Sequence, residues 1–210
     1  MNIEPLWDIR LRTPRLELRL PTEAELDAFY RVAAGGIHAP DDMPFAIAWT
    51  DSLTEESFKS FHRGTWESWS PESWTCNFVT FLDGNPIGTQ SIEARNFPEE
   101  KTVGTGSWLG EPYQGRGYGT EQRAAVLEFA FAGLGAATAI SGALFPNIAS
   151  QRISEKLGYR VTGISEVSPR GEPIRHYDYR LDRADWRCPI EVEIVGLEPA
   201  LHLFGASSTR

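Results

Sequence analysis

The chain lacks the features of disulfide-stabilised, membrane-spanning and nucleic-acid-binding proteins. Its 210 residues include two cysteines, Cys76 and Cys188, which are too few for a disulfide framework. No stretch approaches the roughly 20 apolar residues of a membrane span, and residues 1–12 lack the apolar run of a signal peptide. The net charge of -9 argues against a sequence-independent grip on nucleic-acid phosphates. We therefore expect a cytoplasmic protein that binds neither a membrane nor a nucleic acid.

The apolar content is sufficient for a packed core. Hydrophobic residues make up 41% of the chain and aromatic residues 11%, which excludes a disordered chain and predicts one domain over residues 1–210. The core is expected to span about residues 11–187 and to be followed by a strand-bearing extension over residues 188–210. The acidic balance favours a cationic substrate such as an amine, although it serves solubility equally well.

The hydrophobic pattern alternates between strands and helices, which predicts an α/β fold of three layers. Thr22 and Glu25 have the spacing of a capping box, and Gly135 is placed to end the clearest helix. Several antiparallel hairpins are mixed with two strand–helix units. The predicted strands are residues 15–20, 75–82, 86–94, 102–109, 138–144, 160–166, 175–181 and 190–195, and the predicted helices are residues 22–33, 54–69, 120–134 and 147–157.

Glycines alternate at Gly115, Gly117 and Gly119, between a predicted strand and a predicted helix. Glycine permits backbone angles that point successive N–H groups into one concavity, and the N-terminus of the helix adds partial positive charge. Together these features suit a pyrophosphate. An ordinary strand-to-helix turn explains the glycines equally well when they are taken alone.

Better-known phosphate loops do not match this segment. A Walker loop has Gly-Lys-Ser/Thr, whereas Gly119 is followed here by Thr120 and Glu121. The dinucleotide fingerprint requires G-x-G-x-x-G and an acidic residue about 20 positions later, where this chain is rich in alanine. A flavodoxin-like nucleotide binder would carry the loop after its first strand, but about 110 residues precede the loop here.

The segment from Gln114 to Gly119 resembles the Q/R-x-x-G-x-G/A signature of the GCN5-related N-acetyltransferase (GNAT) superfamily. Asn147, Ser150 and residues 155–159 (EKLGY) are similar to that family's second coenzyme A segment. Residues 11–19 are similar to the start of the branch that acetylates ribosomal-protein N-termini. Residues 38–45 resemble a loop of actinobacterial-type members, at least one of which uses succinyl-CoA. The resemblance covers about residues 11–186 and implies the GNAT fold, with a mixed, mostly antiparallel sheet splayed at the acyl-CoA site.

The resemblance implies a coenzyme A site made of two segments. The pyrophosphate is expected on the backbone amides of the glycine loop, and the pantetheine along the strand that contains Trp108, where a backbone N–H stabilises the oxyanion. Asn147 is expected to bond to pantetheine, to cap its helix, or to do both. Arg116 either adds charge to a phosphate or is solvated. The expected coenzyme-binding residues are Trp108, Leu109, Gln114, Gly115, Arg116, Gly117, Tyr118, Gly119, Thr120, Asn147 and Ser150; no metal is expected.

The catalytic groups are less well defined by the resemblance. Ser154 stands where many family members carry a tyrosine and where the ribosomal-protein branch often has serine. Its hydroxyl is expected either to protonate the leaving CoA thiolate or to face solvent. Glu93 is the first candidate for the base that deprotonates the amine, although such carboxylates are more often only solvated. The alternative bases are Glu72, Asp41, Asp42 and His38.

The acceptor site is expected around residues 37–49 and the helix that follows them. The predicted substrate-binding residues are His38, Asp41, Met43 and Phe45. Three tryptophans, Trp49, Trp66 and Trp69, either line the same pocket or belong to the core.

The function implied by the resemblance is transfer of an acyl group from acetyl-CoA or succinyl-CoA to an amine, which is a protein N-terminus, a lysine or a small amine. A non-catalytic acyl-CoA-binding or regulatory module on the same fold is the alternative, against which the intact glycine loop weighs. Neither cysteine has a neighbouring histidine in the sequence to activate it, which favours direct attack by the amine in a ternary complex. The alternating strand at 190–195 needs a surface to cover, and we expect a homodimer.

Overall fold

One nine-stranded sheet organises the part of the chain that the computed structural model describes, residues 1–207. Its strands are β1 (Arg10–Arg12), β2 (Glu17–Arg19), β3 (Ser73–Leu82), β4 (Asn85–Arg95), β5 (Thr102–Leu109), β6 (Thr138–Leu144), β7 (Arg160–Val167), β8 (Ile174–Asp182) and β9 (Glu193–Val195). Their order is β7-β8-β6-β5-β4-β3-β2-β1-β9. The pairing is antiparallel throughout, except between the parallel neighbours β5 and β6.

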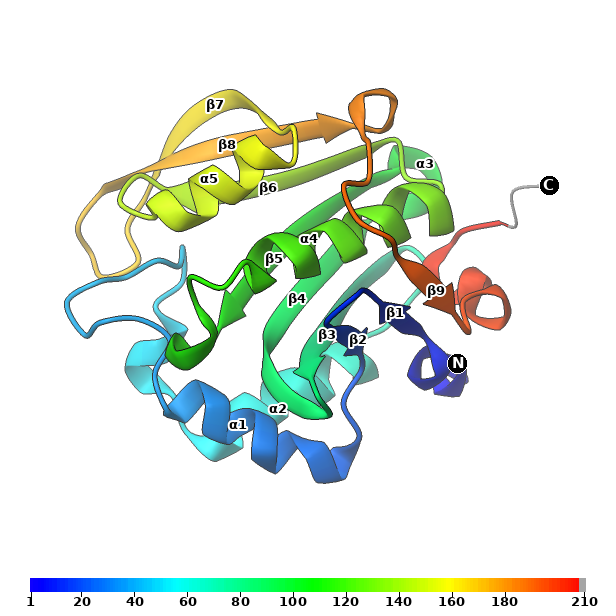
Figure 1. Cartoon of the computed structure of the whole chain (residues 1–210), viewed down its shortest axis with the longest axis horizontal. Coiled ribbons are helices and arrows are strands. Elements are labelled where there is room, and N and C mark those ends of the chain that lie inside the picture. Colours follow the sequence, from blue (N-terminus) through cyan, green and yellow to red (C-terminus); the bar gives the residue numbers. More distant parts are fainter. Residues whose placement is uncertain (208–210) are drawn as a thin grey trace.

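Helices cover both faces of this sheet (Figure 1). The longer ones are α1 (Leu26–Ala34), α2 (Glu55–Glu67), α4 (Tyr118–Glu128) and α5 (Ile148–Lys156), and α3 (Phe97–Glu100) is a single turn. The helices α1 and α2 lie on one face, while α4 and α5 lie on the other. The structure therefore confirms the predicted three-layer α/β fold with a mixed, mostly antiparallel sheet. No helix within residues 1–207 combines the length and apolar character needed to cross a bilayer.

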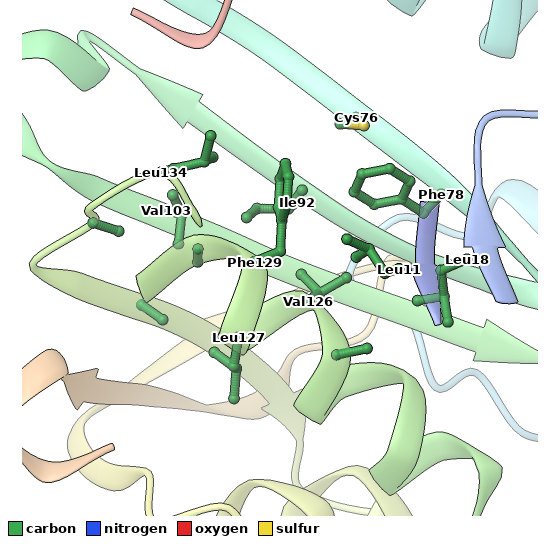
Figure 2. Packing of buried hydrophobic residues seen from close by; sticks show 14 of the residues in the cluster. Leu11, Leu18, Cys76, Phe78, Ile92, Val103, Val126, Leu127, Phe129 and Leu134 are labelled. Carbon is green, nitrogen blue, oxygen red and sulfur yellow. The ribbon is translucent and has the colours of Figure 1, made fainter. Parts of the chain in front are cut away.

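The main core lies between α4 and the sheet (Figure 2). Val126 and Phe129 project from the helical side toward Phe78 and Ile92 of the sheet. Cys76 lies in the same layer with no exposed surface, and burial raises the pKa of its thiol well above the usual value. Cys76 is therefore a core thiol. A thiol held in its neutral form is a poor nucleophile.

The helix predicted over residues 120–134 differs from the structure at both ends. It begins at Tyr118, and its α-helical part ends at Glu128, where a π-helical turn from Phe129 to Gly133 takes over. In this turn the Leu134 N–H donates to the Phe129 carbonyl. Gly135 then adopts a φ of +71° and ends the element as predicted. Residues 121–131 are buried on every side except at Glu128, so the apolar pattern gives no sign of a single turn with i→i+5 hydrogen bonds.

The C-terminal segment completes the chain's own sheet. The strand predicted over 190–195 is shorter than expected, and it pairs with β1 as β9. Ile190, Val192 and Ile194 pack against the main core, to which Leu203 and Phe204 also belong. Because this chain itself covers the apolar side of β9, that strand no longer argues for a second subunit. The homodimer stays a prediction without this support, and residues 208–210 of the expected extension lie outside the described residues.

The capping box before α1 has the predicted geometry and provides a test of acid stability. Glu25 accepts hydrogen bonds from the Thr22 N–H at 2.8 Å and from two Arg19 nitrogens at 2.8 and 2.6 Å. The Arg19 guanidinium is the largest cause that lowers the pKa of Glu25 to about 2. In the unfolded chain this pKa is near 4.3. The stabilisation is therefore complete above about pH 4.5 and is lost as the pH falls toward 2.

We expect Glu25→Gln to remove this pH-dependent contribution. The free energy of unfolding should be measured by urea titration from pH 7 to pH 2.5. At neutral pH it should be about 1–2 kcal/mol lower for the variant than for the native protein, after allowance for partial solvent exposure. This difference in the free energy of unfolding should become smaller as the pH falls. A difference that stays constant across this pH range would mean that Arg19 does not stabilise the charged form of Glu25 in the folded state.

Candidate active site

The strands β5 and β6 separate halfway along their length and leave a V-shaped opening in the sheet. Their pairing runs only from Thr102 opposite Thr138 to Thr105 opposite Ser141. Beyond these residues β5 pairs only with β4, and β6 pairs only with β8. At the apex, Ser141 Oγ donates to the Thr105 carbonyl at 3.1 Å. The facing edges of the two strands, from Gly106 and Gly142 onward, thus leave backbone groups available to an extended ligand.

The glycine loop lies at the wide end of this opening, where it enters α4. Gly115 and Gly117 have φ values of +71° and +84°, which are conformations that favour glycine. Gly117 is the N-cap of α4, and no side chain caps the first turn, which contains Tyr118, Gly119 and Thr120. An uncapped N-terminus with a positive dipole end is suited to an anion.

Gln114 holds the loop in place. Its Nε2 donates to the Leu109 carbonyl at 2.8 Å and to the Ile37 carbonyl at 2.7 Å. The Gln114 side chain therefore ties the loop to the end of β5 and to the segment that follows α1. This geometry assigns the side chain a positioning role, while the predicted anion contacts belong to the backbone of the loop. The Arg116 side chain is exposed, as expected if it is a solvated loop residue.

Arg15, which no sequence pattern singled out, lies beside the same loop. Its Nη1 donates to the Arg116 carbonyl at 3.1 Å, and its guanidinium lies over the Tyr118 ring, 4.5 Å from the ring centroid. The buried carboxylate of Glu121, in the first turns of α4, accepts from Arg15 Nε at 2.7 Å and from Thr13 Oγ1 at 2.6 Å. These bonds fasten the segment before β2 to the loop and place positive charge next to it.

Asn147 is the N-cap of α5 and also contacts the acceptor loop. Its Oδ1 accepts from the Ser150 N–H at 3.1 Å, and its Nδ2 is 3.4 Å from the Pro44 carbonyl. The capping role is thus confirmed. One N–H of the amide is left for another acceptor. The contact also shows that the loop between α1 and α2 extends to the start of α5, and Figure 1 shows this loop running beyond the strand ends toward the turn between β7 and β8.

Ser154 is fully buried, so its solvent-facing alternative is wrong. Its Oγ accepts from Arg123 Nη1 at 3.2 Å, and Ser107 Oγ of β5 accepts from Nη2 of the same guanidinium at 3.0 Å. Each serine oxygen accepts a hydrogen bond from Arg123. The hydrogen of each hydroxyl therefore points away from Arg123 and can be donated to another group. Arg123 and Ser107 were not foreseen from the sequence.

Arg123 is a buried cation without a carboxylate partner. It is 3% exposed, no ion pair involves it within residues 1–207, and its Nε has no hydrogen-bond partner there. Burial lowers the pKa of this arginine. A positive charge in such surroundings favours a negative charge that develops nearby, because a low dielectric strengthens the attraction.

Of the predicted substrate-binding residues, His38 and Phe45 are in contact, with ring centroids 5.7 Å apart. His38 lines a hollow between the end of α1 and the segment before α2, together with Thr50 and Asp51. Both imidazole nitrogens of His38 are engaged, Nδ1 with the Ala39 carbonyl at 2.9 Å and Nε2 with Thr50 Oγ1 at 2.8 Å. Phe45 also packs against Trp49, at the edge of a second core that is formed mainly by buried residues of α1, α2 and β3. Met43 is buried and Asp41 is exposed.

The tryptophans divide between the main core and the α1–α2 face of the sheet. Trp108 stacks on Phe29 with ring centroids 5.2 Å apart and belongs with Trp49 and Trp66 to the edge of the second core. Trp69 is a core residue, since its Nε1 donates to the Leu203 carbonyl at 2.7 Å. The side chain of Trp108 thus shapes the α1–α2 face of the opening.

Glu93 lies on this same face of the sheet. It is opposite Gly104 of β5, where an added Cβ would come within 3.2 Å of Glu93 Oε1. Its carboxylate is exposed and has weak neighbours, Thr75 Oγ1 at 3.5 Å and Arg95 Nη2 at 3.9 Å. Glu93 therefore approaches the opening from the β4 side without a partner that orients it. Within residues 1–207, no group of three ligating side chains is arranged to hold a metal ion.

Comparison with known proteins agrees with this geometry. A family model described as "Acetyltransferase (GNAT) domain" matches residues 15–160. A GNAT-family acetyltransferase from Bacillus anthracis is similar in structure, with a TM-score of 0.67 and 20% identity over 83% of this chain and 99% of that one. RimJ from Mycobacterium smegmatis, solved with CoA-disulfide, has a TM-score of 0.67 and 18% identity over 85% and 88%.

A third structure, RimL, is described as a ribosomal L7/L12 alpha-N-protein acetyltransferase. It has a TM-score of 0.64 and 17% identity over 81% of this chain and 91% of that one. At such identities these structures establish a shared fold, and the family model, which covers most of the chain, establishes the family. The chain therefore belongs to the GNAT family of acetyltransferases and is an acyl-CoA-dependent N-acyltransferase.

Proposed function

We propose that this enzyme transfers an acetyl or succinyl group from its CoA thioester to a primary amine, by direct attack within a ternary complex. One observation carries the proposal: the uncapped N-terminus of α4 and the opening between β5 and β6 meet at the glycine loop. The first suits a pyrophosphate, and the second suits an extended arm with amide groups. A molecule of coenzyme A has both, in that order.

The residues of the loop and the adjoining strand fit this co-substrate. An added Cβ at Gly115 would meet no atom within 4 Å, so the loop surface is open to a phosphate. The backbone amides of residues 115–120 would hold the pyrophosphate, with charge from Arg15 and Arg116 beside them. The free edge of β5 around Trp108 and Leu109 would pair with the pantetheine arm, and Asn147 and Ser150 would border it from α5.

The polar groups behind the opening suit departure of a thiolate. The hydroxyls of Ser154 and Ser107 both accept from Arg123, so both can donate to a developing negative charge. We assign to Ser154 the role of proton donor to the leaving sulfur. A backbone N–H on the free edge of β5 would stabilise the oxyanion. The thioester supplies the activated carbonyl when it is bound.

The acceptor approaches from the α1–α2 face in this proposal. The loop between α1 and α2 borders that face, and the ion pair of Arg170 with Asp51, at 2.6 Å, joins it to the turn between β7 and β8. With the loop fastened in this way, we favour a slender amine such as a protein N-terminus as the acceptor. The RimL relative named above acts on such an amine, which supports the same acceptor class here.

The order of chemical steps can be tested by initial-rate kinetics. We expect intersecting lines when acyl-CoA and the amine are varied together, since direct attack requires both substrates at once. Cys76→Ala and Cys188→Ala should each retain at least half of the turnover. Burial raises the pKa of both thiols, so neither is suited to nucleophilic attack.

Two results would contradict direct attack. One is a set of parallel lines, which indicates a covalent acyl-enzyme. The other is an acylated peptide trapped from the enzyme and acyl-CoA alone that passes its acyl group to an added amine. If bound acyl-CoA stabilises the fold but no amine causes release of free thiol, the alternative of a non-catalytic acyl-CoA-binding module replaces the proposal.

A further inference from the structure

A histidine–aspartate pair lies next to the apex of the opening. His176 and Asp178 are on β8 with one residue between them, so their side chains share one face of the sheet. Nδ1 of His176 is 3.0 Å from Oδ1 of Asp178. Neither residue belongs to the glycine loop, to α5 or to the acceptor loop, and the sequence pattern of a hairpin strand gave no reason to select them.

Two glycines on the neighbouring strands make room for the pair. Asp178 is opposite Gly142 of β6 and Gly163 of β7. A Cβ added at Gly142 would lie 2.2 Å from Nε2 of His176, and one added at Gly163 would lie 3.0 Å from Oδ2 of Asp178. Gly142 does not have a positive φ, so its backbone conformation does not require glycine. The imidazole lies directly over the space that the missing side chain leaves.

That space is where the strands part. Ser141 is the last β6 residue paired with β5, and Gly142 is the first residue beyond it. Gly142 and His176 lie on the sheet face opposite α4, because the alternate residues Ala143 and Tyr177 pack in the core on the α4 side. This is the α1–α2 face, from which we propose that the amine approaches. The neighbouring Ile140 is 45% exposed, so the surface over β6 is open.

The hydrogen bonds of the pair leave one nitrogen available as a base. The Asp178 carboxylate accepts the Nδ1–H, which places the lone pair on Nε2. Nε2 has no hydrogen-bond partner within residues 1–207. Asp178 is the charged group that faces the imidazole on β8, whereas β6 offers Gly142 and β7 offers the neutral Ser165, with Oγ 3.5 Å from Nδ1.

The other candidate bases lack this arrangement. His38 has both nitrogens bonded, and the Glu93 carboxylate is loosely placed over Gly104 on the β4 side of the apex. Gly104 and Gly142 are about one strand spacing (~4.8 Å) and two residues (~6.6 Å) apart. Glu93 and His176 therefore flank the same opening from opposite sides, and His176 alone is held by a carboxylate.

We propose that His176, oriented by Asp178, is the base that deprotonates the attacking amine. The assignment deepens the proposed acyl transfer and depends on it. The amine nitrogen forms a C–N bond with the thioester carbonyl carbon as the C–S bond breaks. The amine proton passes to Nε2, and the electron pair of the C–S bond leaves on sulfur, which Ser154 protonates. The imidazolium then releases its proton to water, and the Ser154 alkoxide regains one from water, so both groups return to their starting states.

Kinetics of variants test the role directly. With acetyl-CoA and a mixture of peptides bearing free N-termini, His176→Gln should lower kcat about 100-fold and leave the CoA-dependent rise in Tm unchanged. The His176→Gln substitution should also remove one limb of the pH–rate profile, namely the part of the pH dependence that is caused by protonation of the base. Asp178→Asn should shift this limb and lower kcat about 10-fold. Glu93→Gln and His38→Gln are matched controls, and both should retain the limb.

A spectroscopic readout separates this proposal from the acyl transfer itself. The chain has four histidines, so NMR of isotope-labelled histidine can be assigned by comparison with His176→Gln. We expect the tautomer of His176 with hydrogen on Nδ1, and loss of that preference in Asp178→Asn. A hydrogen on Nε2, an unchanged pH limb in His176→Gln, or loss of the limb in Glu93→Gln would each overturn the assignment. Absence of transfer by the native enzyme to every amine would refute the proposed function instead, and the tautomer would still be measured.

Discussion

Gly117→Glu is expected to abolish binding of coenzyme A and to lower acyl transfer by more than 100-fold. The native protein should gain about 5–10 °C in Tm when CoA is present at 100 times its Kd, because a ligand that binds only the folded state raises stability. The variant places a carboxylate at the uncapped N-terminus of α4, where the pyrophosphate is expected. Like charges in this position repel, so the rise in Tm should vanish.

Gly84→Glu is the matched control for backbone strain and charge. Gly84 has a φ of +78°, close to the +84° of Gly117, and lies in the turn between β3 and β4 with no atom within 4 Å of an added Cβ. It should lose a similar amount of stability but keep the full response to CoA. Gly115→Glu provides a second variant in the loop if Gly117→Glu does not fold. A response to CoA that survives in a folded loop variant would show that the pyrophosphate binds elsewhere.

The second large effect is expected at Ser154. Ser154→Ala should lower kcat about 100-fold and change the Kd of CoA by less than threefold, because the hydroxyl contributes a proton to the leaving sulfur and no binding contact to the phosphates. A stopped assay of CoA release, together with calorimetric titration of CoA, separates the two quantities. Rescue by a thioester with a more acidic thiol would support the role, since such a sulfur leaves without a proton.

Ser107→Ala is the control for the structural part of this effect. Both substitutions remove one acceptor from the buried Arg123 guanidinium, and a buried donor left without a partner costs about 1–3 kcal/mol. The two variants should therefore lose similar stability, while only Ser154→Ala loses most of its turnover. Equal losses of kcat would mean that the serines merely satisfy Arg123.

Local patterns predicted the elements that carry the coenzyme site. The strand expected over 138–144 has those bounds as β6, and Asn147 caps the helix that was expected to follow it. Both depend on short-range features, namely alternation of apolar residues and capping chemistry at a fixed spacing. The glycine loop likewise lies between a strand and a helix, as its residues indicated.

The features that were missed depend on contacts distant in sequence. β1 has three residues, too few to show a period, and its partner β9 begins 181 positions after its Arg12. Arg123 looks like a surface residue in the sequence, yet α5 and β5 enclose it. The His176–Asp178 pair gains its meaning only because β8 lies beside β6 where β5 departs. A one-dimensional pattern does not report which polar side chains the fold encloses.

The central claim is that this chain moves an acyl group from CoA to an amine. Its most direct test is mass spectrometry of a cell extract incubated with the enzyme and with either acetyl-CoA or succinyl-CoA, with Gly117→Glu as the blank. We expect protein N-termini that carry one acyl group with the native enzyme and are unmodified with the variant, and the donor that yields the product identifies the acyl group. Identical peptide masses with the native enzyme, the variant and no enzyme, under conditions in which CoA demonstrably binds, would contradict the account.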